Sequence, residues 1–140
     1  MRKSILAGIL IGLGDIILLS ITPKILGAVL FSFGLVTIIN MQLYLFTGKI
    51  GFLYKNNISQ MLYILIFNLI GIAGIIGLYS IANPSFITLL SAAATIKFEK
   101  KILTLFINAI FCGMLIHFAV KNKNIFITVM SVVIFILIGA

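Results

Sequence analysis

The residues of this chain that could carry out proton chemistry lie inside long apolar stretches. Asp15 lies in the first of these stretches, and Cys112 and His117 lie together in a later one. A carboxylate in the middle of a membrane span costs about 2.5–3.5 kcal/mol, so Asp15 must face a wet cavity, pair with a cation or carry a proton. A histidine exchanges protons near neutral pH, whereas one cysteine provides neither a disulfide framework nor metal-ligand spacing. We therefore consider Asp15 and His117 as proton-exchange groups, with a hydrogen-bonded structural role as the alternative for each, and expect no cofactor and no metal.

The composition defines the class of protein. Of 140 residues, 63% are hydrophobic and 9% charged, with ten basic and two acidic side chains, and the mean hydropathy is +1.36. Such a chain lacks the polar surface of a soluble domain, so we expect an all-α integral membrane protein that forms one transmembrane domain over residues 1–140. The net charge of +8 reflects basic residues between apolar stretches, which indicates contacts with lipid headgroups and no nucleic acid. The sequence contains no nucleotide-binding or catalytic motif, and we expect no enzyme.

The second apolar stretch, Leu26 to Lys49, is long enough to cross a bilayer but contains helix-weakening and polar residues. Gly34, Asn40 and Gln42 lie inside it, and it ends in Phe46-Thr47-Gly48. Lipid cannot hydrogen-bond a free backbone group, so an interrupted helix is stable only where protein covers it or where it lines a cavity. This stretch is therefore the first candidate for a conduction path.

Four other stretches are long and apolar enough to be spans. They are Ser4–Ile21, Met61–Ile81, Ile102–Val120 and a fifth that starts near Ile125. Close helix packing is predicted for the first span by Gly8 and Gly12. In the third span, Gly71, Gly74 and Gly77 are predicted to share one helix face, and Asn68 is predicted to be the polar contact on that face. The mixed segment from Asn83-Pro84 to Lys101 is predicted to be a connection that dips back to the mouth of the pore.

The basic residues predict the orientation. With the amino end inside, six lysines and arginines fall on the inner side and four on the outer side. The inner six are Arg2, Lys3, Lys49, Lys55, Lys121 and Lys123. Positive residues are enriched on the cytoplasmic side, so we expect a multi-pass cell-membrane protein with a cytoplasmic amino end.

Several motifs resemble those of the formate/nitrite transporter family. Phe31-Ser32-Phe33-Gly34-Leu35 and Leu45-Phe46-Thr47 are similar to the second-span motifs of that family, at the family's separation. Asn68-x-x-Gly71, Lys97 with the segment Phe111 to Val120, and Phe135-x-x-x-Gly139 resemble its later motifs.

The resemblance implies a homopentamer of aquaporin-like protomers, each with a pore for small monovalent anions such as formate or nitrite. It implies that Phe31 and Phe135 form an outer hydrophobic constriction and that Leu35 and Phe46 form an inner one. Thr47 would lie on the pore loop, and Lys97 would attract anions at the outer vestibule.

The sequence also departs from the family pattern. Gly139-Ala140 precedes the position of the family's glutamate–histidine pair, so relative to the six-span pattern the domain is incomplete. Gly113 and His117 replace the asparagine and the second cysteine of the fourth-span motif. A non-transporting membrane protein that packs with a longer paralogue, and a holin-like pore former, are therefore alternative interpretations.

Overall fold

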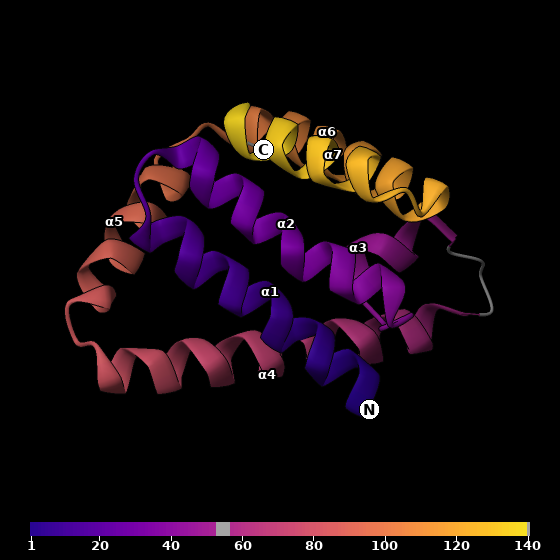
Figure 1. The fold of residues 1–140 in the computed structure, drawn as a ribbon, viewed down its shortest axis with the longest axis horizontal. Coiled ribbons are helices and arrows are strands. Elements are labelled where there is room, and N and C mark those ends of the chain that lie inside the picture. Colours follow the sequence, from indigo (N-terminus) through magenta and orange to yellow (C-terminus); the bar gives the residue numbers. More distant parts are fainter. Residues whose placement is uncertain (53–56, 140) are drawn as a thin grey trace.

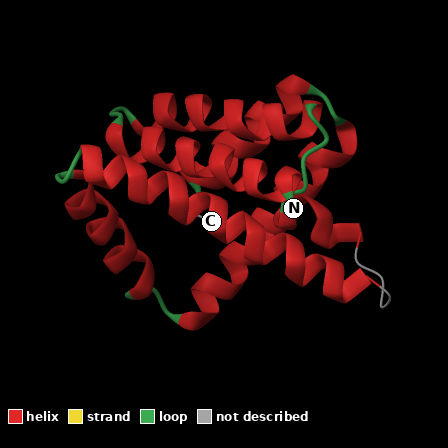
Figure 2. Cartoon of the chain, turned by 90° about the horizontal axis from the view of Figure 1, so that it is seen from below, coloured by secondary structure: helices red, strands yellow, loops and turns green. Residues whose placement is uncertain are grey.

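The computed structural model describes residues 1–52 and 57–139 of the chain. Over these residues the chain is built of helices and loops, with no strand (Figure 2). In chain order the helices are α1 Arg2–Ser20, α2 Lys24–Asn40, α3 Phe46–Lys49, the 3-10 turn η1 Ile50–Phe52, α4 Ile58–Ala82, α5 Phe86–Phe98, α6 Ile102–Asn122 and α7 Ile125–Leu137. Lys55, which the sequence places in a polar loop, lies outside the described residues.

The helices form three layers (Figure 1). In the middle layer α1 packs against α2. On one side α4 packs against α1, and on the other α7 packs against α2 while α6 packs against α7. Helix α5 connects the end of α4 to the start of α6 at the end of the molecule opposite the amino terminus (Figure 1).

Three helices of the described chain, α1, α4 and α6, are long and apolar enough to cross a membrane. The chain is thus an all-α membrane protein. The predicted second and fifth spans are shorter as continuous helices, since α2 has 17 residues and α7 has 13. An α-helix rises 1.5 Å per residue, so 13 residues cover only about 20 Å of a hydrocarbon core about 30 Å thick. The segment predicted as a mixed connection contains a regular helix, α5.

The contact between α1 and α4 depends on glycines at which the two backbones touch. A Cβ atom at Gly8 would collide with the backbone of Asn68, and one at Gly71 with the backbone of Ile5 and Ile9. A Cβ atom at Gly12 would collide with the side chain of Ile75. Small residues let helices approach this closely, and van der Waals packing is a main source of helix association in lipid.

The prediction that the glycines of α4 share one face is wrong. Gly71 is buried, whereas Gly74 and Gly77 are exposed, and no described atom lies within 4 Å of a Cβ built at either. Each residue turns an α-helix by about 100°, so a three-residue step falls about 60° short of a full turn. Two such steps turn Gly74 about 120° away from Asn68, and three turn Gly77 to the opposite side of the helix. Neither glycine therefore packs against another described helix of this chain.

Candidate functional site

The predicted interruption of the second apolar stretch is present between Asn40 and Phe46. At this point α2 ends, Gln42 takes a left-handed conformation with φ of 52°, and the Leu43 N–H donates to the Ile38 carbonyl at 2.9 Å. The chain then runs extended through Leu45, which precedes α3. Leu43 and Leu45 are buried, whereas Met41 and Gln42 are exposed. The part of the non-helical segment that leads into α3 therefore lies inside the protein, as an apolar surrounding requires.

Asn68 of α4 holds the interrupted segment. Its Nδ2 donates to the Ser4 carbonyl at 2.7 Å and to the Tyr44 carbonyl at 2.8 Å. Its Oδ1 accepts a hydrogen bond from the Phe46 N–H at 2.8 Å. One buried amide thus satisfies two backbone groups on either side of Leu45 and ties them to α1 and α4, which fixes the position of α3.

A cavity of about 280 Å³, here called the central cavity, lies beside this segment. It is lined by side chains of α1, α2, α3, α4, α6 and α7 and by Leu45: Ile11, Phe31, Leu35, Leu45, Phe46, Thr47, Leu65, Asn68, Leu69, Ile72, Cys112, Ile116 and Phe135. The lining is almost wholly apolar. An apolar space of this kind stays dry and strongly disfavours a bare charge.

Toward the α5 end of the molecule, Phe31 and Phe135 separate the central cavity from a second pocket. The two rings meet edge to face, with centroids 6.1 Å apart and planes at 80°. The second pocket, about 470 Å³ and here called the Lys97 pocket, contains both rings and also Asp15, Lys97 and Lys100. The aromatic pair is thus a hydrophobic partition with charged groups on one side.

The two ends of α7 are anchored, which positions Phe135. At its start the Asn124 side chain accepts from the Phe126 and Ile127 N–H groups at 2.9 and 3.3 Å, the usual way to satisfy free donors at a helix start. Past its end the Gly139 carbonyl accepts from Lys100 Nζ at 3.1 Å and from Asn108 Nδ2 at 2.9 Å.

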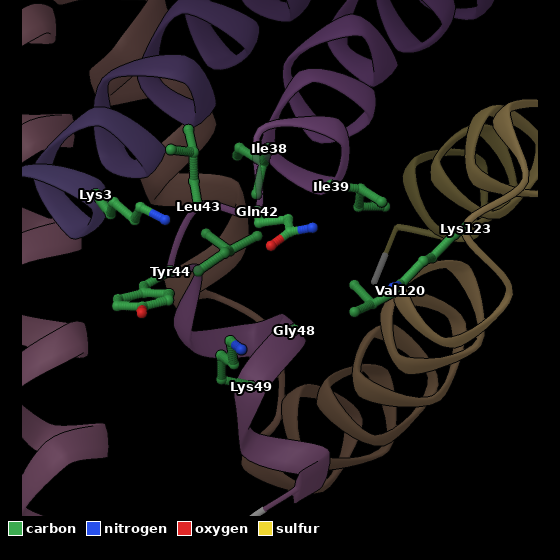
Figure 3. A pocket seen from close by; sticks show the side chains of 11 residues that line it. Lys3, Ile38, Ile39, Gln42, Leu43, Tyr44, Gly48, Lys49, Val120 and Lys123 are labelled. Atoms are coloured by element: carbon green, nitrogen blue, oxygen red, sulfur yellow. The ribbon is translucent and has the colours of Figure 1, made fainter.

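At the opposite end a third pocket of about 340 Å³, here called the tyrosine pocket, shares Leu45 with the central cavity. Figure 3 shows its lining, with Lys3 and Tyr44 on one side, Lys49 below and Lys123 on the other side. The lining residues are Lys3, Ile38, Ile39, Gln42, Leu43, Tyr44, Leu45, Gly48, Lys49, Val120 and Lys123.

The three pockets follow one another along α2. Phe31 lines the Lys97 pocket and the central cavity, Leu35 the central cavity, and Ile38 and Ile39 the tyrosine pocket. The seven helical steps from Phe31 to Ile38 rise by roughly 10 Å. A series of cavities, divided at Phe31–Phe135 and at Leu45, therefore leads from one end of the molecule toward the other.

The structure brings most of the predicted pore residues together. All four predicted constriction residues and Thr47 line the central cavity, and Lys97 with Asp15 lines the pocket beyond Phe31. Asp15 thus shares its pocket with cations from α5 and from the connection that follows.

His117 lies away from this series. It lines a groove of α6 and α7 together with Phe111, Phe118 and Ile134, and its ring lies against Gly51, where an added Cβ would collide with Nδ1. It lines none of the three pockets. The position of His117 favours the structural role that the sequence left open over proton exchange along the path.

The sequence analysis did not predict three residues that line these pockets. Leu45 divides two of the pockets, Tyr44 lies in the pocket at the amino-terminal end, and Cys112 lines the central cavity. Leu45 belongs to the Leu45-Phe46-Thr47 motif, so its position beside the cavity could have been inferred. No pattern in the sequence indicates that Tyr44 lines a pocket. Among the described residues no group of histidine, cysteine and acidic side chains could hold a metal ion.

Comparisons of the chain with protein-family models, with curated proteins and with solved structures found no match.

Proposed function

We propose that this protein is a membrane pathway for small monovalent anions, of the kind that the motifs shared with the formate/nitrite transporters imply. The observation that supports it is the series of three pockets, in which the predicted constriction residues surround one central cavity. The proposal includes a cell-membrane location with a cytoplasmic amino end, and five crossings in which α2 and α7 are the short ones. By the same resemblance, aquaporin-like protomers assemble as a homopentamer.

The physical basis of selection is a dry passage with a charged mouth. Lys97 and Lys100 raise the local concentration of anions beside Phe31 and Phe135. The aromatic pair and the apolar central cavity then exclude hydrated ions and penalise a bare charge. A small weak acid crosses such a barrier most readily as its neutral form, and Asp15 is the titratable carboxyl group closest to this step, because it shares the pocket with the partition.

The test is flux in liposomes that contain the full chain. We expect saturable uptake of formate or nitrite and no release of trapped carboxyfluorescein. Replacing Lys97 with glutamine lowers uptake at low salt by roughly tenfold, the lower range of electrostatic steering, and the difference shrinks at high salt. Lys101→Gln is the matched control, since Lys101 lines none of the three pockets and its loss changes uptake by less than about twofold.

A second variant tests the partition. Phe31→Ala opens the contact with Phe135, so larger monovalent anions such as lactate or benzoate gain permeability relative to formate. Dye release by the unaltered chain would instead indicate a holin-like pore. Absence of anion uptake by the unaltered chain would reject the proposal and favour a membrane protein without transport activity.

A further inference from the structure

The tyrosine pocket concentrates positive charge that the proposed pathway does not require. The Lys3 Nζ lies 5.6 Å from the centroid of the Tyr44 ring, and the Lys49 Nζ lies 5.3 Å from the same centroid. Each cation gains about 0.5–1 kcal/mol from a ring face at an exposed site. Two like charges held at one ring also repel each other, so this arrangement favours an anion between or beside them.

The chain supplies no acidic partner for these lysines. Its two acidic residues are Asp15 and Glu99, and neither lines the tyrosine pocket. Asp15 lines the Lys97 pocket instead, and Glu99 directly follows α5, at the other end of the molecule (Figure 1). The counter-charge at the tyrosine pocket therefore has to come from outside the chain.

The pocket also offers the geometry and the donors for a polyvalent anion. The ends of Lys3 and Lys49 point into the space between the labelled side chains in Figure 3. Lys123 lines the other side from the turn between α6 and α7, and Gln42 and Tyr44 add an amide and a hydroxyl. Its volume of about 340 Å³ equals that of roughly ten water molecules, which leaves room for more than one small ion.

We propose that the tyrosine pocket binds a phosphate group. Three lysine ammonium groups suit a polyvalent oxyanion, since lysine binds phosphate as a point charge and charge-assisted hydrogen bonds are the strong ones. The site lies at the ends of α1 and α6, two of the membrane-spanning helices, where lipid headgroups are found. The phosphate group belongs either to an anionic lipid headgroup or to a soluble phosphate compound.

Two binding assays separate these sources, and neither depends on transport. In the first, the full chain in dodecyl maltoside micelles is dialysed to equilibrium against radiolabelled inorganic phosphate. In the second, it is placed in phosphatidylcholine nanodiscs with or without phosphatidic acid, and the lipid retained by the protein is counted by native mass spectrometry. Saturable binding in the first assay indicates a soluble ligand, and retention of phosphatidic acid in the second alone indicates a headgroup.

The decisive variants are a matched pair of double substitutions. Lys3→Gln with Lys49→Gln removes two charges inside the pocket, whereas Arg2→Gln with Lys121→Gln removes two exposed charges at the same end but outside its lining. The first pair should weaken binding by about tenfold or more and the second by less than about twofold. Lys123→Gln, in the exposed turn on the far side of the pocket, should also weaken binding and is the substitution least able to disturb the helices. Equal losses in both double variants, or no saturable binding in either assay, would overturn the proposal.

Discussion

The two halves of α4 contain the same kinds of residue and behave differently. In the part of α4 up to Gly71, here called the first half, Asn68 and Gly71 are buried against α1. Asn68 fixes the interrupted segment through three hydrogen bonds. In the second half Gly74 and Gly77 are exposed, with no described atom near them. The difference shows that a glycine in an apolar helix contributes to packing only where it lies on the face that meets another helix.

The buried half is also the half that shapes the central cavity. Asn68 lines the central cavity and bonds to the backbone on both sides of Leu45, which is the residue shared with the tyrosine pocket. The packing of α4 on α1 and the shape of the cavity therefore have a common origin. Substitutions in the two halves of α4, and in the part of α1 that packs against it, should therefore change the free energy of unfolding by different amounts.

Asn68→Leu should have the largest effect. It leaves the Phe46 N–H and the carbonyls of Ser4 and Tyr44 without their partner, and unsatisfied buried groups cost about 1–3 kcal/mol each in water and somewhat less in membranes. We expect the free energy of unfolding, measured by dodecyl sulfate titration in mixed micelles, to fall by roughly 3 kcal/mol.

Asn122→Leu is the matched control for that measurement. Asn122 is exposed and makes a single bond, from Nδ2 to the Phe118 carbonyl at 2.8 Å, so its loss should change the unfolding free energy by about 0.5 kcal/mol or less. Similar losses in both variants would show that Asn68 does not hold the interrupted segment.

Gly71→Ala comes next. The added Cβ atom would meet the backbone of Ile5 and Ile9, which cannot move without displacing α1, so we expect a loss of about 1–3 kcal/mol from overpacking. Gly77→Ala, the same change six residues further along α4 and on a different face, meets no described atom. Its expected effect is neutral or stabilising by up to about 1 kcal/mol, because alanine has the higher helix propensity. Equal destabilisation at both positions would mean that the second half of α4 is covered by another chain.

Apolar length and motif spacing predicted the coarse structure well. Pore-lining roles for Phe31, Leu35 and Phe135 were implied by the family resemblance, and all three line the central cavity. The all-helical membrane class and the interruption before Phe46 follow from hydropathy and from the helix-weakening residues of the second apolar stretch. These features depend on local backbone preferences and on which residue types lipid tolerates, and both are written in the sequence itself.

Features that depend on rotation about a helix axis could not be predicted in the same way. The three-residue spacing of Gly71, Gly74 and Gly77 suggested one face, although a 3.6-residue turn spreads them around α4. His117 lies inside an apolar stretch as Cys112 does, yet only Cys112 reaches the central cavity. Tyr44 gains its role from Lys3, which is distant in sequence, so no local pattern reveals it.

Gly12→Ala should have a smaller effect than Gly71→Ala. The added Cβ atom would meet the side chain of Ile75, which is only partly buried and can turn to another rotamer, so we expect a loss of about 1 kcal/mol. The same titration measures it. A loss as large as that of Gly71→Ala would show that the side chains between α1 and α4 are as rigid as their backbones.

Ser4→Ala should have the smallest effect, and in the opposite direction. The Ser4 side chain is 0% exposed, and its Oγ has no hydrogen-bond partner among the described residues, although its carbonyl accepts from Asn68. Removing an unsatisfied buried hydroxyl while keeping the backbone should raise the unfolding free energy by up to about 1 kcal/mol.

Ser32→Ala is the contrasting variant. Ser32 is equally buried, but its Oγ donates to the Val29 carbonyl at 2.5 Å, so this substitution should lower the unfolding free energy by about 0.5–1 kcal/mol. If Ser4→Ala instead destabilises the protein as much as Ser32→Ala does, the Ser4 hydroxyl has a hydrogen-bond partner outside the described residues, such as a buried water molecule.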